Sequence, residues 1–545
     1  MPVILATPAD APGDGFDSWC AIAGAADLLF GRPAPQTLDP AGRVADLGKR
    51  LNGAFDAIRD EWFALARALG QNTSAALAHA PACAANASDL GLMLAWTRVV
   101  ESLAAESRTT LVLCDDPWLF RHLTDRPGVR AGRPPKLASV EFRLRLRGLA
   151  ARAWVAARMT LAAIRFSAQR KSVVRQRGPW ILAYAHPASA AGETDAYFGS
   201  LMTKLHGLAR VLHVDGPSGR ARRICGTSKQ TLSLHAFGSP LFALTLVAAR
   251  WRPRAEGAKT LSGVEGANAW LIRRAAAREG GTGQPAMLAW QIHCQNRWLA
   301  AAHPKVVAWP WENHSWERAL VRACRSLDVK TVGYQHATVG RREWNYAPDS
   351  NPDEASLPDQ ILCAGSAWAA RLRAFGHRAE SLAVGGAWRM PSIARLAREP
   401  SGPVFVALPS DAAVAAEMIA AIQPLARRGS RFIVRDHPMT PFPFAAEPGI
   451  GRADGPLATQ KKIAAVLYAG TTVGLEAVLG GLPTVCFLPE TTIANDILPD
   501  GLSVPTASAA ELGDVLRQAT AAPAPDARNV FAPVEIDIWR AALRA

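Results

Sequence analysis

Short apolar runs alternate with helix-length segments along most of the chain. Between residues 180 and 365 these runs read WILAYA, ARVLHVD, KVVAWPW, KTVGYQH and QILCAG, and each ends in small or polar residues. Strand, helix and strand alternating at this spacing predict a parallel sheet whose strands are joined by crossover helices.

A second series of the same kind begins near Gly402. Its strand candidates read PVFVALP, RFIVRDHP, IAAVLYAG and PTVCFLP, and the helices between them read AAVAAEMIAAIQPLARR and TVGLEAVLGG. Two series predict an α/β fold with two Rossmann-like domains, over 179–395 and 396–545. In such domains ligands bind at the carboxyl ends of the strands, so we expect the chemistry in a cleft between the two halves.

The first part of the chain follows the pattern more loosely. Residues 1–125 contain the strand candidates VILAT and TLVLCDD around helical stretches, and predict an additional mixed α/β region. Residues 126–178 begin with a linker rich in proline, glycine and arginine. From Val140 to about Gln169 the chain is rich in alanine, leucine and arginine and free of proline, which predicts a basic helical segment.

Composition agrees with a globular chain of several domains, because 49% of the 545 residues are hydrophobic and only 20% are charged. The net charge of +15 favours an anionic partner. Because no acidic residue lies between Arg143 and Arg177, this segment is a candidate for binding an anionic membrane surface. Its alternative is an ordinary solvated helix face. Nucleic acid is not an expected partner, because no motif that binds it accompanies the charge.

The cysteines and the N-terminus indicate a cytoplasmic protein, peripheral on the inner membrane if it binds lipid. The eight cysteines form no CxxC pair and no Cys/His cluster, so neither a zinc module nor a disulfide scaffold is expected. The N-terminus lacks the features of a secretory signal. No run approaches the roughly 18 to 20 apolar residues that a membrane span needs.

A helix start in the second series is a candidate phosphate site. Gly470, Thr471 and Thr472 follow the strand AAVLY, and hydroxyls with free backbone N–H groups at a helix N-terminus bind phosphate. The alternative is that the threonines only cap the helix. One turn further, Glu476 is placed to accept the hydroxyls of a ribose if it faces the cleft. Arg435, His437 and Pro438 follow another strand, where the two basic side chains suit a leaving phosphate.

Two residues of the first series are candidates for the catalytic base. His336 ends the run KTVGYQH, and a histidine suits the task by its pKa. Glu312 follows the strand KVVAWPW and is the carboxylate alternative.

Asn313 and His314 suit helix capping, and Glu317 and Arg318 belong to the next helix. We expect the residues after WILAYA, namely His186, Glu193, Asp195 and Tyr197, to shape the acceptor side.

These motifs resemble known families. The pattern AGTTVGLEAVLGGLPTV with an HP pair is similar to the nucleotide-sugar domain of GT-B glycosyltransferases, among them CMP-sugar transferases. YQHA resembles the QHG segment of capsule synthesis enzymes and CDP-glycerol glycerophosphotransferases, with Ala337 in place of a glycine. The longer likeness, from Trp180 to Pro489, is to a bacterial surface carbohydrate biosynthesis family of the capsule or O-antigen type.

The resemblance implies a GT-B glycosyltransferase of surface polysaccharide biosynthesis, in capsule or lipopolysaccharide. Its donor would be a nucleotide-activated sugar, with CMP-linked sugars among the candidates, and its acceptor a glycan or lipid-linked glycan. No cofactor and no metal are expected, because helix ends and basic side chains can neutralise the leaving phosphate and the chain has no Asp-x-Asp pair. The alternatives are a polyol-phosphate transferase, a nucleotide-sugar epimerase and a non-catalytic binding protein on the same fold.

Overall fold

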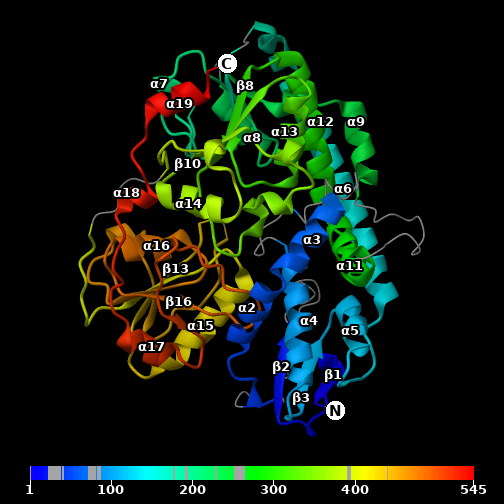
Figure 1. Cartoon of the computed structure of the whole chain (residues 1–545), viewed down its shortest axis with the longest axis vertical. Coiled ribbons are helices and arrows are strands. Elements are labelled where there is room, and N and C mark those ends of the chain that lie inside the picture. The colour runs from blue at the N-terminus through cyan, green and yellow to red at the C-terminus, as the bar shows by residue number, and fades with distance from the viewer. Residues whose placement is uncertain are drawn as a thin grey trace.

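The computed structural model describes residues 2–22, 38–39, 42–70, 82, 88–175, 178–190, 194–226, 230–250, 264–389, 395–438 and 440–544. Within these residues three sheets form three lobes, and every strand pair in them is parallel. Figure 1 shows the N-terminal lobe at the lower right, the middle lobe at the top and the C-terminal lobe at the lower left. The predicted α/β class with two Rossmann-like sheets is confirmed, and the third sheet belongs to the first part of the chain.

The middle lobe is built on a seven-stranded sheet of order β11-β10-β9-β8-β5-β6-β7. Its strands are β5 (Trp180–Ala183), β6 (Ala209–Leu212), β7 (Thr231–Ser233), β8 (Val306–Pro310), β9 (Lys330–Gln335), β10 (Gln360–Cys363) and β11 (Leu382–Val384). Its helices are α7 (Leu201–Lys204), α8 (Ser218–Cys225), α9 (Pro240–Thr245), α12 (Gln284–Ala302), α13 (Ser315–Arg325) and α14 (Ser366–Ala374). The strand order reverses between β5 and β8, which makes this pair the switch point of the sheet.

The C-terminal lobe is built on a six-stranded sheet of order β14-β13-β12-β15-β16-β17. Its strands are β12 (Val404–Ala407), β13 (Phe432–Arg435), β14 (Ile450–Arg452), β15 (Ala465–Tyr468), β16 (Thr484–Phe487) and β17 (Thr506–Ala507). Its helices are α15 (Ala412–Arg427), α16 (Thr472–Leu479) and α17 (Leu512–Gln518). Here the switch point lies between β12 and β15.

The N-terminal lobe contains a four-stranded sheet of order β2-β3-β1-β4. Its strands are β1 (Val3–Ala6), β2 (Ser18–Ile22), β3 (Thr110–Cys114) and β4 (Val129–Ala131). Its helices are α2 (Leu47–Ala57), α3 (Arg59–Gly70), α4 (Leu90–Ala104) and α5 (Pro117–Thr124). Sequence patterns predicted β1 and β3 but missed β2, and they placed β4 in a linker, because both strands are short and flanked by turn residues.

Two segments pack on a lobe other than the one expected from their place in the chain. Helices α10 (Val264–Ala267) and α11 (Ala269–Gly280) join the N-terminal lobe, where the buried Arg274 pairs with Asp116. Helices α18 (Ala527–Val530) and α19 (Ile536–Ala542) return to the middle lobe. Trp539 packs there against Phe198, and its Nε1 donates to the Gly385 carbonyl. The prediction that 396–545 forms one unit is therefore corrected for its last residues.

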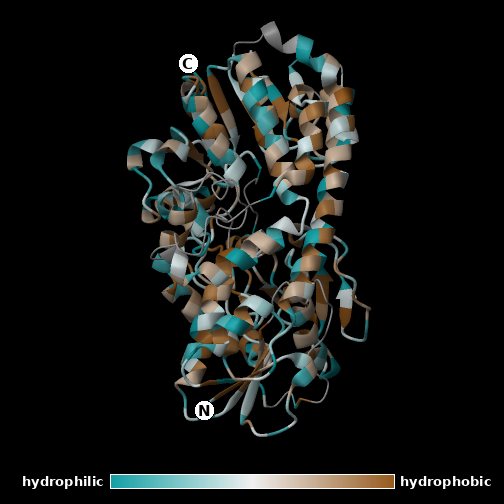
Figure 2. Ribbon diagram, turned by 90° about the vertical axis from the view of Figure 1, so that its right-hand side faces the viewer, coloured by the Kyte–Doolittle hydropathy of each residue, from teal (hydrophilic) through white to brown (hydrophobic). Residues whose placement is uncertain are grey.

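Burial explains why the central strands form. All residues of β1, β3, β5, β6 and β8 are buried, as expected for parallel strands covered by helices on both faces. In Figure 2 brown strands lie inside the lobes, among helices that carry both teal and brown. The helix predicted from Val140 to Gln169 is α6 (Leu137–Phe166), which runs along one side of the N-terminal and middle lobes (Figure 1).

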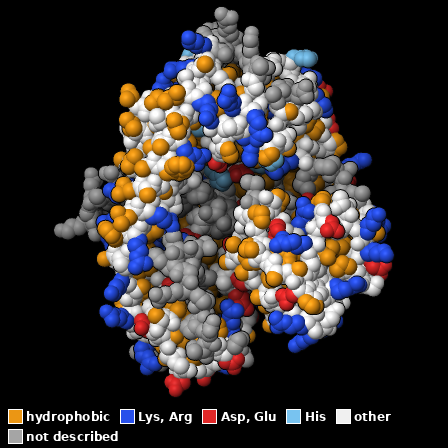
Figure 3. Space-filling view, turned by 180° about the vertical axis from the view of Figure 1, so that it is seen from behind, with side chains coloured by type: hydrophobic (Ala, Val, Ile, Leu, Met, Phe, Trp, Pro, Cys, Tyr) orange, Lys and Arg blue, Asp and Glu red, His pale blue; other side chains and the backbone are white. Residues whose placement is uncertain are grey.

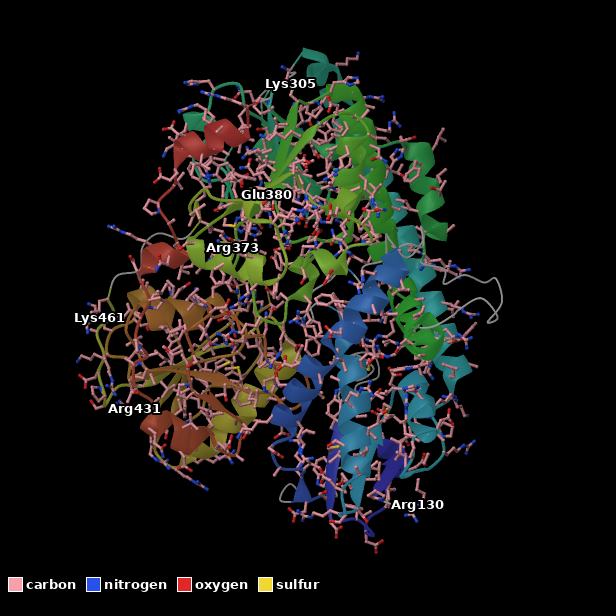
Figure 4. The ribbon with its side chains drawn as sticks, viewed as in Figure 1. Arg130, Lys305, Arg373, Glu380, Arg431 and Lys461 are labelled. Atoms are coloured by element: carbon pink, nitrogen blue, oxygen red, sulfur yellow. The ribbon has the colours of Figure 1, made fainter. Side chains whose placement is uncertain are left out.

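The carboxyl ends of the two larger sheets point toward the junction of the lobes. Lys305 and Arg431 immediately precede β8 and β13, and both lie at the outer ends of their lobes (Figure 4). At the other end, Arg341 after β9 pairs with Asp496 after β16 and donates to the Leu502 carbonyl. The crevice of each sheet therefore opens toward the other lobe.

Candidate active site

Glu312 and His336 lie together where β8 and β9 end. A Glu312 carboxylate oxygen is 3.7 Å from His336 Nε2, and the other is 3.5 Å from His314 Nδ1. The Glu312 side chain is 32% exposed, whereas that of His336 is 4% exposed. The carboxylate is therefore the most exposed group of this cluster, and the two imidazoles flank it.

The turn that carries Glu312 is held by the start of α13. Glu317, which is buried, accepts hydrogen bonds from the backbone N–H groups of Glu312, Asn313 and His314 and from Trp309 Nε1. Burial, assisted by the Glu312 carboxylate, raises the pKa of Glu317 to about 8. His314 is the N-cap of α13 and forms a capping box with Glu317. The capping role expected for His314 is confirmed.

Asn313 has a different role from the capping expected of it. Its backbone has φ of 58°, in the left-handed region that asparagine tolerates better than most residues. Its side-chain amide is buried and donates to the Asn345 carbonyl and to Asn351 Oδ1. Arg318 on the next helix turn donates to the Asn313 carbonyl and to Ser350. Together these contacts fix the direction in which the chain leaves β8.

Aromatic side chains from neighbouring strand ends surround Glu312. Tyr184 follows β5, across the switch point from β8, and its ring lies 4.7 Å from that of His213 and 5.5 Å from that of Tyr197. Tyr197 in turn meets His336 edge to face at 5.0 Å. Burial raises the pKa of Tyr184 well above its usual value, and the Glu312 carboxylate adds to this effect. Aromatic rings thus line the switch point beside the Glu312 carboxylate.

Burial keeps the imidazoles of this site neutral at neutral pH. It lowers the pKa of His336 to about 4, although the Glu312 carboxylate acts in the opposite direction. Burial also lowers the pKa values of His314 to about 4 and His213 to about 3. Among the described residues, His336 Nδ1 and His213 Nε2 are buried without a hydrogen-bond partner.

The loop expected to shape the acceptor side is fixed by a buried ion pair. Arg210 on β6 pairs with Asp195 at 3.2 Å, with both side chains fully buried, and also donates to the Ala190 carbonyl. Asp195 accepts from the backbone N–H of Tyr197 and so directs that residue toward His336. His186 packs on Tyr197. Glu193 lies outside the described residues.

The candidate phosphate site lies at the switch point of the other sheet. Gly470, Thr471 and Thr472 follow β15, and Thr471 is the N-cap of α16. Its hydroxyl does not cap the helix, and within the described chain Thr471 Oγ1 is buried without a partner. Gly470 has φ of 56°, a conformation that glycine adopts without strain. Within the described residues this geometry leaves a hydroxyl without a partner at the start of an eight-residue helix. The first N–H groups of a helix have no acceptor one turn earlier, although here the Gly474 N–H donates to the Thr471 carbonyl.

The remaining candidates of the C-terminal lobe lie beside that switch point. Arg435 is the last residue of β13, and His437 and Pro438 follow it. β12 separates β13 from β15. Burial raises the pKa of Glu476, and the Arg435 guanidinium partly offsets this, so these two side chains are electrostatic neighbours. Burial lowers the pKa of His437, which contacts Thr440 through Nδ1.

Asn495 joins the two halves of the site and was missed by sequence reasoning. It lies in the irregular segment after β16, and its side-chain N–H donates to Glu343 Oε1 at 3.1 Å. Glu343 accepts from the Gly340 N–H in the loop after His336, and a Cβ added at Gly340 would collide with the Asn495 amide. A Cβ added at Gly470 would contact the Asn495 Cβ at 3.5 Å. The loop after β9 and the loop after β15 therefore meet at one residue.

The described residues of this site include no group of three or more His, Cys, Asp or Glu side chains arranged to hold a metal ion. The substitution of Ala337 for the glycine of the related segment has little consequence, because Ala337 is not among the residues with positive φ. Tyr184 and His213 could be found only partly from sequence. His213 ends a predicted strand, but the pairing of β5 with β8 depends on a strand order that local patterns do not encode.

Comparison with known proteins gives a weak likeness. No family model and no curated protein matches the chain. UDP-N-acetylglucosamine 2-epimerase from Rickettsia bellii and the lipopolysaccharide outer core galactosyltransferase WaaB each align at 11% identity and TM-score 0.32, over 67% of this chain and 94% of theirs. The S. aureus MnaA-UDP structure aligns at 11% identity and TM-score 0.36, over 67% of this chain and 95% of its own. At this level of similarity the activity must be argued from the residues of the site.

Proposed function

We propose that the protein is a glycosyltransferase of bacterial surface polysaccharide biosynthesis, which moves a sugar from a nucleotide-activated donor to a glycan or lipid-linked acceptor. The observation that carries the proposal is the pair of facing switch points. One presents the accessible Glu312 carboxylate between two neutral imidazoles. The other presents the unpartnered Thr471 hydroxyl at a helix start, and Asn495 lies between them.

In this proposal Glu312 is the general base. Its carboxylate accepts the proton of the acceptor hydroxyl as that oxygen bonds to the anomeric carbon, and the bond from this carbon to the donor phosphate breaks. His336 is less suited to remove the proton, because its side chain is only 4% exposed and an acceptor reaches the Glu312 carboxylate more easily. As a neutral imidazole beside the Glu312 carboxylate it orients that group through Nε2.

The leaving nucleotide phosphate is placed at the start of α16. Thr471, Thr472 and the free N–H groups of the first turn donate to the phosphate oxygens, and the helix dipole favours their negative charge. Arg435 and His437 add positive or hydrogen-bonding groups beside this site, with Pro438 fixing the turn. Glu476, on the next turn of α16, accepts the ribose hydroxyls. Gly470 lets the phosphate approach the backbone closely.

The proposal is tested first by ligand-induced stabilisation. Thermal unfolding is measured with CMP, CDP, UDP and GDP, and a nucleotide at 100 times its dissociation constant adds about 2.7 kcal/mol of stability. Thr471→Val should abolish this shift, while Thr471→Ser, which restores the hydroxyl, should retain it. If no nucleotide stabilises the protein, the proposed donor site is wrong.

Transfer is tested separately with the nucleotide sugar of the nucleotide that binds and a lipid-linked glycan acceptor. We expect Glu312→Gln to lower transfer on the order of 10²- to 10⁴-fold, as loss of a general base does, while nucleotide stabilisation stays unchanged. Glu380→Gln, at the surface of the middle lobe (Figure 4), is the matched control. Inversion of a carbon centre of the donor sugar in the absence of an acceptor would instead identify an epimerase. A Glu312→Gln variant with full activity would remove Glu312 from the mechanism.

A further inference from the structure

Helix α6 exposes large hydrophobic side chains to solvent. Phe142, Leu146, Leu149, Trp154, Leu161 and Ile164 are between 46% and 67% exposed. Helix α9 packs beside α6 and adds Leu241 and Leu244, which are 78% and 66% exposed. We call these eight side chains the docking face. Figure 3 shows hydrophobic side chains gathered along one edge of the molecule, over these helices.

The docking face is a second apolar face of α6. At about 100° per residue, its six residues on α6 fall within an arc of about 140°. The buried residues of the same helix, among them Leu144, Val155 and Met159, point to the opposite side and pack on the other elements. Because α6 already buries one apolar face, the exposed one is not needed to hold the fold together. Exposed apolar surface of this kind marks a binding surface.

Positive charge borders the docking face. Exposed arginines of α6 are Arg143, Arg145, Arg147, Arg158 and Arg165, and the exposed Arg170 and Lys171 follow. Arg147, Arg158 and Arg165 lie along one edge of the apolar arc. Arg147 and Arg165 each donate one hydrogen bond to the protein, to the Gly281 carbonyl and to Ser218, and keep their charge at this edge. Glu141 is the only acidic residue of α6.

We propose that the docking face binds the surface of an anionic phospholipid membrane. Apolar side chains next to a row of arginines match the boundary between acyl chains and headgroups, where an amphipathic helix lies in the plane of the surface. The long arginine side chains reach the phosphates while their stems stay near the apolar layer. A second copy of this chain fits less well, because face-to-face contact would bring two rows of arginines together. Among the described helices none is long and apolar enough to cross a membrane.

This inference does not rest on the proposed reaction, and a sedimentation experiment tests it. The full-length protein is mixed with vesicles of phosphatidylcholine alone or with 30% phosphatidylglycerol. The salt concentration is about 0.1 M, at which the Debye length is about 10 Å. We expect the protein to sediment with the anionic vesicles, and much less of it to sediment with the neutral vesicles. The double variant Trp154→Ser/Leu161→Ser should weaken binding to anionic vesicles at least tenfold. Leu327→Ser, which removes an exposed leucine elsewhere, is the control.

Charge is tested with Arg158→Glu/Arg165→Glu, which should also weaken binding at least tenfold, because each well-placed cation contributes about fivefold. Arg373→Glu, on the surface of the middle lobe (Figure 4), is the control. Thermal unfolding confirms that each variant is folded. Equal binding by the variants and controls would overturn the proposal. It would also be overturned if Trp154→Ser/Leu161→Ser dissociated a dimer in sedimentation equilibrium while vesicle binding stayed the same.

Discussion

At the scale of single residues, burial decides which groups of the site carry charge. His314 and His336 lie beside the Glu312 carboxylate and His213 packs on Tyr184, yet burial lowers the pKa of each imidazole to between about 3 and 4. Glu312, 32% exposed, is the most exposed member of this group and lies among neutral rings. In the proposed reaction this matters because a cationic imidazole beside Glu312 would compete with the acceptor hydroxyl for the carboxylate.

The lowered pKa of His213 predicts a pH-dependent stability. An unfolded histidine titrates near 6.5, and folding holds His213 neutral down to about pH 3. Between these values the unfolded state binds the additional proton, so this contribution is complete above pH 6.5 and decreases as the pH falls. The stability difference between wild type and His213→Gln should therefore shrink by about 1.4 kcal/mol per pH unit below pH 6.5.

Urea unfolding at pH 7.5, 6.0 and 5.0 measures that difference. His206→Gln, which removes an exposed imidazole, is the control for loss of a histidine in general. A difference for His213→Gln that does not change with pH would contradict the assignment.

At the scale of elements, sequence patterns located the strand ends but not their neighbours. Each of these strands is predicted from its own apolar run, without knowledge of its neighbours in the sheet. Such strands precede Glu312, His336 and the helix start at Gly470–Thr472. Tyr184 became part of the site because β5 pairs with β8 across more than a hundred residues, and Asn495 because an irregular loop crosses between lobes. Such non-local pairings depend on the packing of the whole chain, and no local pattern reports them.

The first turn of α13 is the element that positions Glu312. Glu317→Ala would leave three backbone N–H groups and Trp309 Nε1 without their acceptor in a buried environment. We expect a loss of about 2 to 4 kcal/mol in the free energy of unfolding, the range for a broken buried hydrogen-bond network. Glu380→Ala, an exposed carboxylate, should change it by less than about 0.5 kcal/mol. Urea denaturation compares the two, and equal stabilities would show that the turn does not depend on Glu317.

At the scale of the whole molecule, the three lobes meet around the segment that follows β16. Arg342 of the middle lobe donates to Asn52 Oδ1 and Asp56 of the N-terminal lobe and to the Ala494 carbonyl of the C-terminal lobe. One residue further, Asn495 contacts Glu343 in the site. The N-terminal lobe thus supports the loop that joins the two halves of the cleft, which gives that lobe a role without a catalytic residue of its own.

This arrangement predicts that Arg342→Ala loosens two lobes at once. The substitution removes hydrogen bonds from a charged donor, each of which contributes about 1.5 to 3 kcal/mol. Solvent screens these contacts little, because the Arg342 side chain is only 18% exposed. In hydrogen-exchange measurements we expect faster exchange both in α2, which carries Asn52 and Asp56, and at Ala494 and its neighbours.

Arg378→Ala, which breaks an exposed pair with Glu354, should leave both segments unchanged. Faster exchange in only one lobe would mean that the lobes are held together by their apolar contacts and that Arg342 does not couple them. Faster exchange in both would show that Arg342 couples the N-terminal lobe to the segment that carries Ala494 and Asn495.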